Sequence, residues 1–190
     1  MTTTEQGPVT AVPGERIFEP GGGSLAWRVR RGVVRLDSLT PAGHSIFANL
    51  AISGDILGCE AMLTGSYAFR ATALTQCELS PWPEGPGAVA GDSLLKSLAT
   101  AQRRAADIVA LRGGQAIGRV VGLLRLLADR AGRVVLPARQ DMADITDLRF
   151  ETISRVIKGL ERSGVIAAIS IDGVRAARGY AVSFPETATP

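Results

Sequence analysis

Hydrophobic and polar positions follow two different periods along this chain. Between residues 16 and 83, short apolar runs alternate with polar residues and are broken by glycine and proline, which is typical of short β-strands. The pattern predicts strands over 27–39, interrupted at Gly32, over 45–51 and over 69–79, with turns at 40–43 and 53–55. After residue 92 the apolar spacing becomes helical. The order predicts an α+β fold in which a small β-roll or jelly roll precedes the helices.

A long helix is predicted over 92–112, beginning at Asp92 and ending before Gly113-Gly114. Its apolar residues are spaced alternately four and three apart, as in the seam of a coiled coil. We expect this face to form a homodimer interface, and the alternative is a helix packed on its own β-roll. The expected seam is Leu94, Leu98, Ala101, Ala105 and Ile108.

Residues 139–160 predict two short helices joined by a tight turn. Asp147 occupies the turn position that requires a left-handed backbone, which Asp tolerates better than most residues. The second helix carries two stripes at helical spacing, one apolar and one polar. The apolar stripe is Ile153, Val156, Ile157 and Leu160, and the polar stripe is Glu151, Ser154, Arg155 and Lys158.

The polar stripe combines a carboxylate, a hydroxyl, a guanidinium and an ammonium, the groups that bind base edges and phosphates in a major groove. Strand-like runs at 165–171 and 180–184 flank a turn at Asp172-Gly173 and predict a hairpin after the helices. Two such helices followed by a hairpin form a winged helix, which indicates binding to double-stranded DNA. The alternative is an amphipathic helix whose polar face is only solvated.

The predicted organisation has four parts. Residues 1–14 are expected to be disordered, 15–91 to form the β-roll, 92–112 the dimerisation helix and 115–190 the winged-helix domain. The formal charge of +3 is compatible with nucleic acid without requiring it. The N-terminus has no apolar run typical of a signal peptide, and the most apolar helix contains Arg119 and Arg125, so a cytoplasmic protein is expected.

This order of parts resembles the CRP/FNR superfamily of bacterial transcription regulators. The resemblance covers most of the chain after residue 15 and is strongest over 141–166. In the β-roll it depends on shorter pieces: Ile17-Phe18, the segment 31–34, Pro41-Ala42-Gly43, and Gly54-Asp55 before Gly58. It implies a cyclic-nucleotide-binding-like jelly roll, a homodimer, an inverted-repeat operator and RNA polymerase as a partner.

Within that superfamily, Glu151, Ser154 and Arg155 resemble the E-x-x-S-R reading residues of the FNR and FixK branch. The resemblance implies half-sites of the TTGAT type. A carboxylate can accept from cytosine N4, and an arginine can donate to guanine O6 and N7. The residues expected to contact phosphates, which fix register rather than read sequence, are Arg139, Gln140, Thr152 and Lys158.

The β-roll departs from the superfamily's cyclic-nucleotide sensors, which carry a Gly-Glu pair and a later Arg-Ser pair. Here Cys59 separates Gly58 from Glu60, and the segment 66–71 has no Arg-Ser pair, so cAMP binding is not expected. Arg70 is interpreted as a strand surface charge and His44 as a solvated turn residue. No cofactor is expected, because two cysteines cannot hold an iron–sulfur cluster within one subunit.

Three other classes of function are the alternatives. A cyclic-nucleotide or other small-ligand regulator conflicts with the missing Arg-Ser pair. A metal-binding enzyme on a cupin-like β-roll needs two or three His, and His44 is the only one, so no catalytic or metal site is expected. A redox regulator would use Cys59 or Cys77, but the neighbouring Glu60 and Glu78 would raise a thiol pKa rather than lower it.

Overall fold

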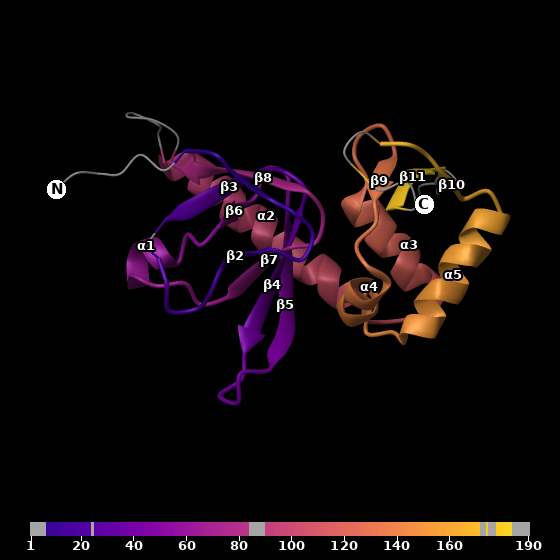
Figure 1. The fold of residues 1–190 in the computed structure, drawn as a ribbon, viewed down its shortest axis with the longest axis horizontal. Coiled ribbons are helices and arrows are strands. Elements are labelled where there is room, and N and C mark those ends of the chain that lie inside the picture. Colours follow the sequence, from indigo (N-terminus) through magenta and orange to yellow (C-terminus); the bar gives the residue numbers. More distant parts are fainter. Residues whose placement is uncertain (1–6, 24, 84–89, 172–173, 175–177, 184–190) are drawn as a thin grey trace. The chain divides into compact units, whose positions relative to one another are not determined.

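The computed structural model describes residues 7–23, 25–83, 90–171, 174 and 178–183. The chain divides into two compact units, Met1–Ala106 and Asp107–Pro190. Strands are the main regular elements of the first unit, and helices are those of the second (Figure 1).

Unit 1 contains two four-stranded sheets in which every strand pair is antiparallel. One sheet has the order β1-β8-β3-β6 and the other β2-β7-β4-β5. Gly32, at a φ of 95°, separates β3 from β4, so the apolar alternation predicted over 27–39 belongs to two strands. The strands are β1 (Val9–Ala11), β2 (Arg16–Phe18), β3 (Ala26–Arg31), β4 (Val33–Leu39), β5 (Ser45–Ile52), β6 (Ile56–Leu57), β7 (Arg70–Ala73) and β8 (Cys77–Trp82).

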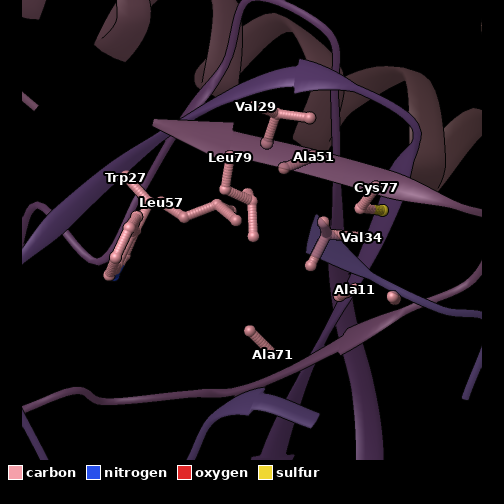
Figure 2. Packing of buried hydrophobic residues seen from close by; sticks show 10 residues of the cluster. Ala11, Trp27, Val29, Val34, Ala51, Leu57, Ala71, Cys77 and Leu79 are labelled. Atoms are coloured by element: carbon pink, nitrogen blue, oxygen red, sulfur yellow. The ribbon is translucent and has the colours of Figure 1, made fainter. Parts of the chain in front are cut away.

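The core of unit 1 draws on strands from both sheets. Val29 of β3 and Leu79 of β8 belong to one sheet, Val34 of β4 and Ala71 of β7 to the other, and all four side chains are buried (Figure 2). Alternate residues of these strands therefore face one shared interior, as in a jelly roll or β-roll. This architecture confirms the fold class expected for the first part of the chain.

Two boundaries differ from the sequence-based expectation. Residues 9–11 form strand β1, which pairs with β8, so the prediction of disorder through residue 14 was wrong for this segment. The backbone N–H and C=O groups of β8 supply the pairing that local sequence could not reveal. The long helix α2 (Ala90–Ala110) begins two residues before Asp92, which is therefore inside the helix rather than its N-cap. A short helix, α1 (Ala61–Thr64), lies between β6 and β7.

Unit 2 packs three helices with a small antiparallel sheet of order β10-β11-β9. The buried face of α5 contributes Ile153, Ile157 and Leu160, as the apolar stripe predicted. Strand β9 was not predicted, because three residues are too few to show a period. The elements are α3 (Ala116–Leu127), β9 (Arg133–Val135), α4 (Arg139–Thr146), α5 (Phe150–Arg162), β10 (Ile166–Ala168) and β11 (Gly179–Val182).

The turn between α4 and α5 has the predicted left-handed residue, since Asp147 has φ 53° and ψ 48°. Two arginines bind the carbonyl groups at the end of α4, which have no partner within the helix. Arg112 donates to the carbonyl oxygens of Asp144 (3.1 Å) and Ile145 (3.3 Å). Arg119 donates to those of Thr146 (3.2 Å) and Asp147 (3.3 Å). These bonds hold the turn that sets the angle between the two helices.

The predicted hairpin after α5 is present as the antiparallel pair β10 and β11, in which Ala167 faces Ala181. Its predicted turn at Asp172-Gly173 lies outside the described residues. Together α4, α5 and this hairpin form a winged helix-turn-helix. Within the part of the chain that the structure describes, no helix combines the length and the apolar character needed to cross a membrane.

Candidate nucleic-acid interface

The polar stripe of α5 lies opposite its buried stripe. Glu151, Arg155 and Lys158 are exposed, and Ser154 is half-buried. At 100° per residue these four positions fall on one side of the helix, while Ile153, Ile157 and Leu160 fall on the other. The structure thus brings the three predicted base-reading residues together on one face of a rigid element.

No intramolecular bond among the described residues uses the charged groups of this stripe. Glu151, Arg155 and Lys158 each have neither a hydrogen bond nor an ion pair there. The first backbone N–H groups of α5 also lack a side-chain cap. A carboxylate, a guanidinium and an ammonium that are exposed and unpaired within the unit remain available to a ligand.

Two further exposed residues lie at the start of α5, and of these only Phe150 was not singled out from the sequence. Arg149, at the N-cap position, is exposed, and the Phe150 side chain keeps 47% of its surface exposed. The adjacency of Phe150 to Glu151 was the available signal in the sequence.

The predicted phosphate-contacting residues lie in two kinds of surroundings. Thr152 is half-buried on α5, beside exposed Glu151. Gln140, exposed at the start of α4, donates to Asp144 at 2.9 Å. Arg139 is half-buried, and its Nη1 lies 3.6 Å from the Met142 sulfur. Arg139 and Gln140 therefore already have partners within α4, whereas Thr152 and Lys158 have none among the described residues.

A side-chain hydrogen bond joins the hairpin to the end of α5. The Tyr180 hydroxyl of β11 donates to Glu161 Oε1 at 2.8 Å. Burial raises the pKa of Tyr180, and the hydrogen bond to Glu161 raises it further, while nearby Arg139 acts in the opposite direction. This bond fixes the strand pair relative to the helix that carries the polar stripe.

The expected seam residues of α2 are not all on one surface. Leu98, Ala101 and Ala105 are exposed, and Leu94 is half-buried. Ile108 is only 4% exposed, so its side chain packs within its own chain and its expected place in the seam was wrong. The exposed apolar residues differ from the expected seam by one position at each end: Leu95 replaces Leu94, and Val109 replaces Ile108. We call them the α2 stripe: Leu95 (67% exposed), Leu98 (50%), Ala105 and Val109 (72%).

Inside unit 1, a tyrosine occupies the space next to the glycines of the β-roll. The Tyr67 ring stacks on Phe18 with ring centres 3.9 Å apart. Its hydroxyl donates to the Leu25 carbonyl oxygen at 2.7 Å and accepts from Trp27 Nε1 at 3.3 Å. A Cβ on Gly58 would approach the Tyr67 ring to 2.5 Å, so only glycine allows this close packing. The ring covers the glycine that resembles the start of a cyclic-nucleotide motif.

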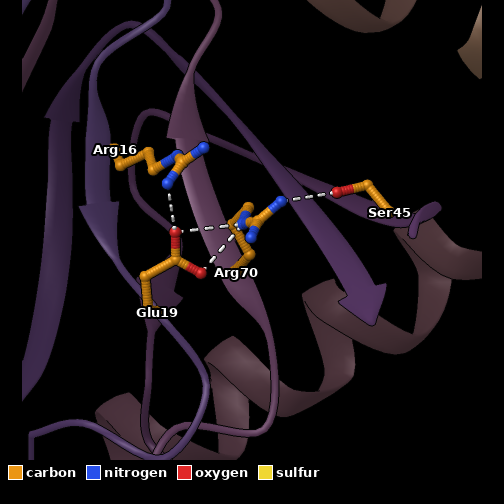
Figure 3. Close-up of polar contacts among 4 residues, drawn as sticks. All are labelled: Arg16, Glu19, Ser45 and Arg70. Atoms are coloured by element: carbon orange, nitrogen blue, oxygen red, sulfur yellow. Dashed lines mark hydrogen bonds and ion pairs between the residues drawn. The ribbon is translucent and has the colours of Figure 1, made fainter. Parts of the chain in front are cut away.

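The other polar groups of that motif region also have internal partners. Glu60 accepts from the Ala68 backbone N–H at 3.3 Å. Arg70 Nε lies 2.8 Å and 3.1 Å from the two carboxylate oxygens of Glu19, and Arg70 Nη1 donates to Ser45 at 2.8 Å (Figure 3). Arg16 also pairs with Glu19 at 3.1 Å. The Arg70 guanidinium is thus committed to a polar cluster between strands.

The thiols and the histidine form no reactive group among the described residues. Burial raises the pKa of Cys77 to about 11. Burial and then the charge of Glu60 raise the pKa of Cys59. His44 is exposed, and its backbone N–H donates to Thr40 Oγ1 at 3.1 Å. Within the described ranges, no group of three or more His, Cys, Asp or Glu residues could hold a metal ion.

Comparisons with known proteins identify relatives of this chain. No protein-family model matches it. It is 32% identical to the nitrogen fixation regulation protein FixK of Bradyrhizobium diazoefficiens, over 82% of this chain and 72% of FixK. It is 30% identical to the transcriptional regulator LdrP of Thermus thermophilus, over 74% of this chain and 77% of LdrP.

A solved structure of a CRP-family transcriptional regulator from Thermus thermophilus matches with a TM-score of 0.65 and 26% identity. The match covers 92% of this chain and 91% of that one. The β-roll, the long helix and the winged helix agree with this relationship, and so does the polar stripe of α5. The chain belongs to the CRP/FNR superfamily of transcription regulators.

Proposed function

We propose that this regulator binds, as a homodimer, an inverted-repeat operator through α5, and that it does so without a cyclic nucleotide. One observation carries the proposal: α5 presents Glu151, Ser154 and Arg155 on a face where the two charged groups have no intramolecular partner among the described residues. An unpaired guanidinium and carboxylate near the start of a helix suit the donors and acceptors of a major groove.

The spacing of these residues favours a short, defined half-site. Glu151 and Arg155 are one turn apart, so they would reach neighbouring base pairs, with Ser154 between them. Their resemblance to the reading residues of the FNR and FixK branch supports a half-site of the TTGAT type. Two α5 helices related by a dyad would read half-sites centred about 34 Å apart. Arg139, Gln140, Thr152 and Lys158 would contact the phosphates, and RNA polymerase is the proposed protein partner.

The α2 stripe supports the dimer. Leu95, Leu98 and Val109 are each at least half exposed, and leaving large aliphatic side chains in water is unfavourable. The small Ala105 between them allows a second helix to approach closely. With exposed Gln102 between Leu98 and Ala105, the stripe follows alternating steps of three and four residues, which match the packing of paired helices.

The dimer can be tested with one substitution at the centre of this stripe. Ala105→Glu places two like charges face to face across the dyad, so sedimentation equilibrium should report monomers and DNA affinity should fall at least about tenfold. Ala110→Glu provides the control for an added charge away from the stripe, because residue 110 is exposed and lies about 140° around the helix from Ala105. It should weaken the dimer less. A wild-type protein that remains monomeric at micromolar concentration would contradict the proposal.

Contacts inside the β-roll support the proposal that no cyclic nucleotide controls this regulator. Tyr67 covers Gly58, and Glu19 binds the Arg70 guanidinium through both of its carboxylate oxygens. A cyclic phosphate would have to displace both contacts and would find no Arg-Ser pair in the segment 66–71. Calorimetry with cAMP and cGMP should therefore detect no binding. A dissociation constant in the low micromolar range, together with a change in DNA affinity, would favour a cyclic-nucleotide regulator instead.

The DNA-binding proposal is tested by selection from a randomised duplex library with purified protein at a stated salt concentration. The expected result is enrichment of one inverted repeat, with the same repeat recovered in the presence of cAMP. Enrichment of no sequence would refute sequence-specific binding, and the polar face of α5 would then be a solvated surface.

A further inference from the structure

Unit 1 contains a second polar site, away from the Tyr67 ring. A cavity of about 260 Å³ lies between the α2 helix, strand β3 and the turn that joins β5 to β6. A water molecule occupies about 30 Å³ in the liquid, and drug-sized ligands need several hundred, so this cavity suits a small ligand. Its charged and hydroxyl-bearing lining residues include Arg28, Asp55, Lys96, Ser97, Thr100 and Arg104.

The charges around this cavity favour an anion. Three cations, Arg28, Lys96 and Arg104, surround one carboxylate, that of Asp55. Asp55 is already engaged, because its Oδ2 accepts from the Ile52 N–H at 2.8 Å and its Oδ1 accepts from Arg104 at 3.2 Å. The carboxylate therefore offsets Arg104. Arg28 Nη1 donates to the Gly54 carbonyl oxygen at 3.1 Å, and Lys96 adds an exposed ammonium to the lining.

Arg104 is built into the wall rather than spread on the surface. Its side chain is only 9% exposed. Its Nε lies 3.0 Å from Asp55 Oδ2 as an ion pair, in a geometry that does not make a hydrogen bond. The ion pair with Asp55 therefore holds the Arg104 side chain in the wall of the cavity.

Other donors converge on the same space. Within the described residues, Lys96, Ser97 and Thr100 have no hydrogen bond or ion pair that engages their side chains. Lys96, Thr100 and Arg104 are each four residues apart and so follow one face of α2. This face is roughly opposite the α2 stripe. The cavity would remain open when a second copy of the chain covers that stripe.

We propose that this cavity binds a small phosphate-bearing anion, free phosphate or a small phosphate ester. Arginine and lysine together with hydroxyl donors are the groups that bind phosphate oxygens. The bound anion would bridge Arg28 of β3 and Lys96 of α2, and so tie the sheet to the helix. This site is independent of the proposed DNA readout, since none of its residues lies in unit 2.

The chain offers a sharp test, because Lys96 and Lys158 are its only lysines. Reductive methylation with ¹³C-formaldehyde labels both while keeping their charge, and Lys96→Gln assigns the signals. Titration with inorganic phosphate should move the Lys96 signal to saturation and leave Lys158, the matched control on α5, nearly unmoved. Chloride at equal ionic strength should move neither signal. Equal, non-saturating movement of both signals would overturn the site.

Calorimetry on the intact protein gives an independent measure. Lys96→Gln should weaken phosphate binding about tenfold, as expected for the loss of one charge-assisted contact. Arg103→Gln, which removes an exposed cation of α2 outside the cavity lining, should leave it unchanged. Tighter binding of glycerol 3-phosphate than of inorganic phosphate would identify an ester as the ligand, and the reverse order would identify free phosphate. Binding of neither, or identical affinities for Lys96→Gln and wild type, would overturn the proposal.

Discussion

Polar side chains have internal partners in residues 58–71 of the β-roll, the region that resembles a cyclic-nucleotide motif. On the outer face of α5 the charged side chains have none among the described residues. In the β-roll, Arg70 is bound by Glu19 and Ser45, and Glu60 is bound by a backbone N–H. On α5, the charged groups of Glu151 and Arg155 have no intramolecular partner among the described residues. The β-roll region resembles a ligand site, but side chains of the same chain occupy it. The charged groups on the outer face of α5 remain available to a ligand.

This difference identifies which region is available to bind another molecule. A ligand at Arg70 would first have to displace Glu19, whose side chain is 39% exposed, and would also meet the buried Tyr67 ring. A rigid helix with unpaired charges has no such partner to displace when it binds. The comparison therefore supports the proposal that α5 is the DNA-reading surface and that the β-roll takes no cyclic nucleotide.

The largest effect is expected from removing the aromatic ring that fills the β-roll. Tyr67→Ala should lower the free energy of unfolding of unit 1 by about 3–5 kcal/mol, the usual cost of deleting a buried aromatic side chain. Urea unfolding followed by tryptophan fluorescence would measure it, with Tyr67→Phe as the milder control. The variant should still not bind cAMP, because Glu19 continues to hold Arg70. Micromolar cAMP binding by Tyr67→Ala would show that the tyrosine alone excludes the nucleotide.

A second expected effect is a loss of stability at high pH caused by Cys77. Burial raises the pKa of Cys77 from 9.0 to about 11 in the folded state, so the folded protein holds this proton more tightly than the unfolded chain. Its contribution is complete below pH 9 and is lost as pH rises towards 11, by roughly 2–3 kcal/mol. Cys77→Ala should lack this part of the pH dependence in urea titrations. Identical slopes for the two proteins between pH 9 and 11 would contradict the assignment.

The smallest effect concerns a charge on the open face. Lys158→Gln should weaken binding to all DNA sequences alike and reduce the slope of log affinity against log salt by about one, as for one lost phosphate contact. Fluorescence anisotropy over a range of salt concentrations would measure the slope. A change in base preference with an unchanged salt slope would assign Lys158 to base reading instead.

Much of unit 2 could be predicted from the sequence, because the signals that define its helices and turn lie within a few residues of one another. The helical period placed Ile153, Ile157 and Leu160 in the core, and the turn chemistry of Asp147 located the junction of α4 and α5. Both signals act within a few residues. The face that carries Glu151 and Arg155 followed directly from the buried face of the same helix.

Features that depend on distant contacts escaped prediction. Tyr67 bonds with residues about forty positions away, and no local pattern marks it as the side chain that fills the β-roll. On α2, apolar residues lie on two faces, so spacing alone could not tell buried Ile108 from exposed Val109. The pairing of Asp55 with Arg104 joins a turn to a helix 49 residues later.

The claim that α5 reads DNA is tested most directly by comparing base preferences of wild type and Arg155→Ala in the same randomised duplex library. The account predicts that wild type selects an inverted repeat and that Arg155→Ala loses about 1–3 kcal/mol of affinity, with relaxed preference at one guanine of each half-site. Unchanged base preference, with only a uniform loss of affinity, would contradict the assignment of α5 as the reading helix.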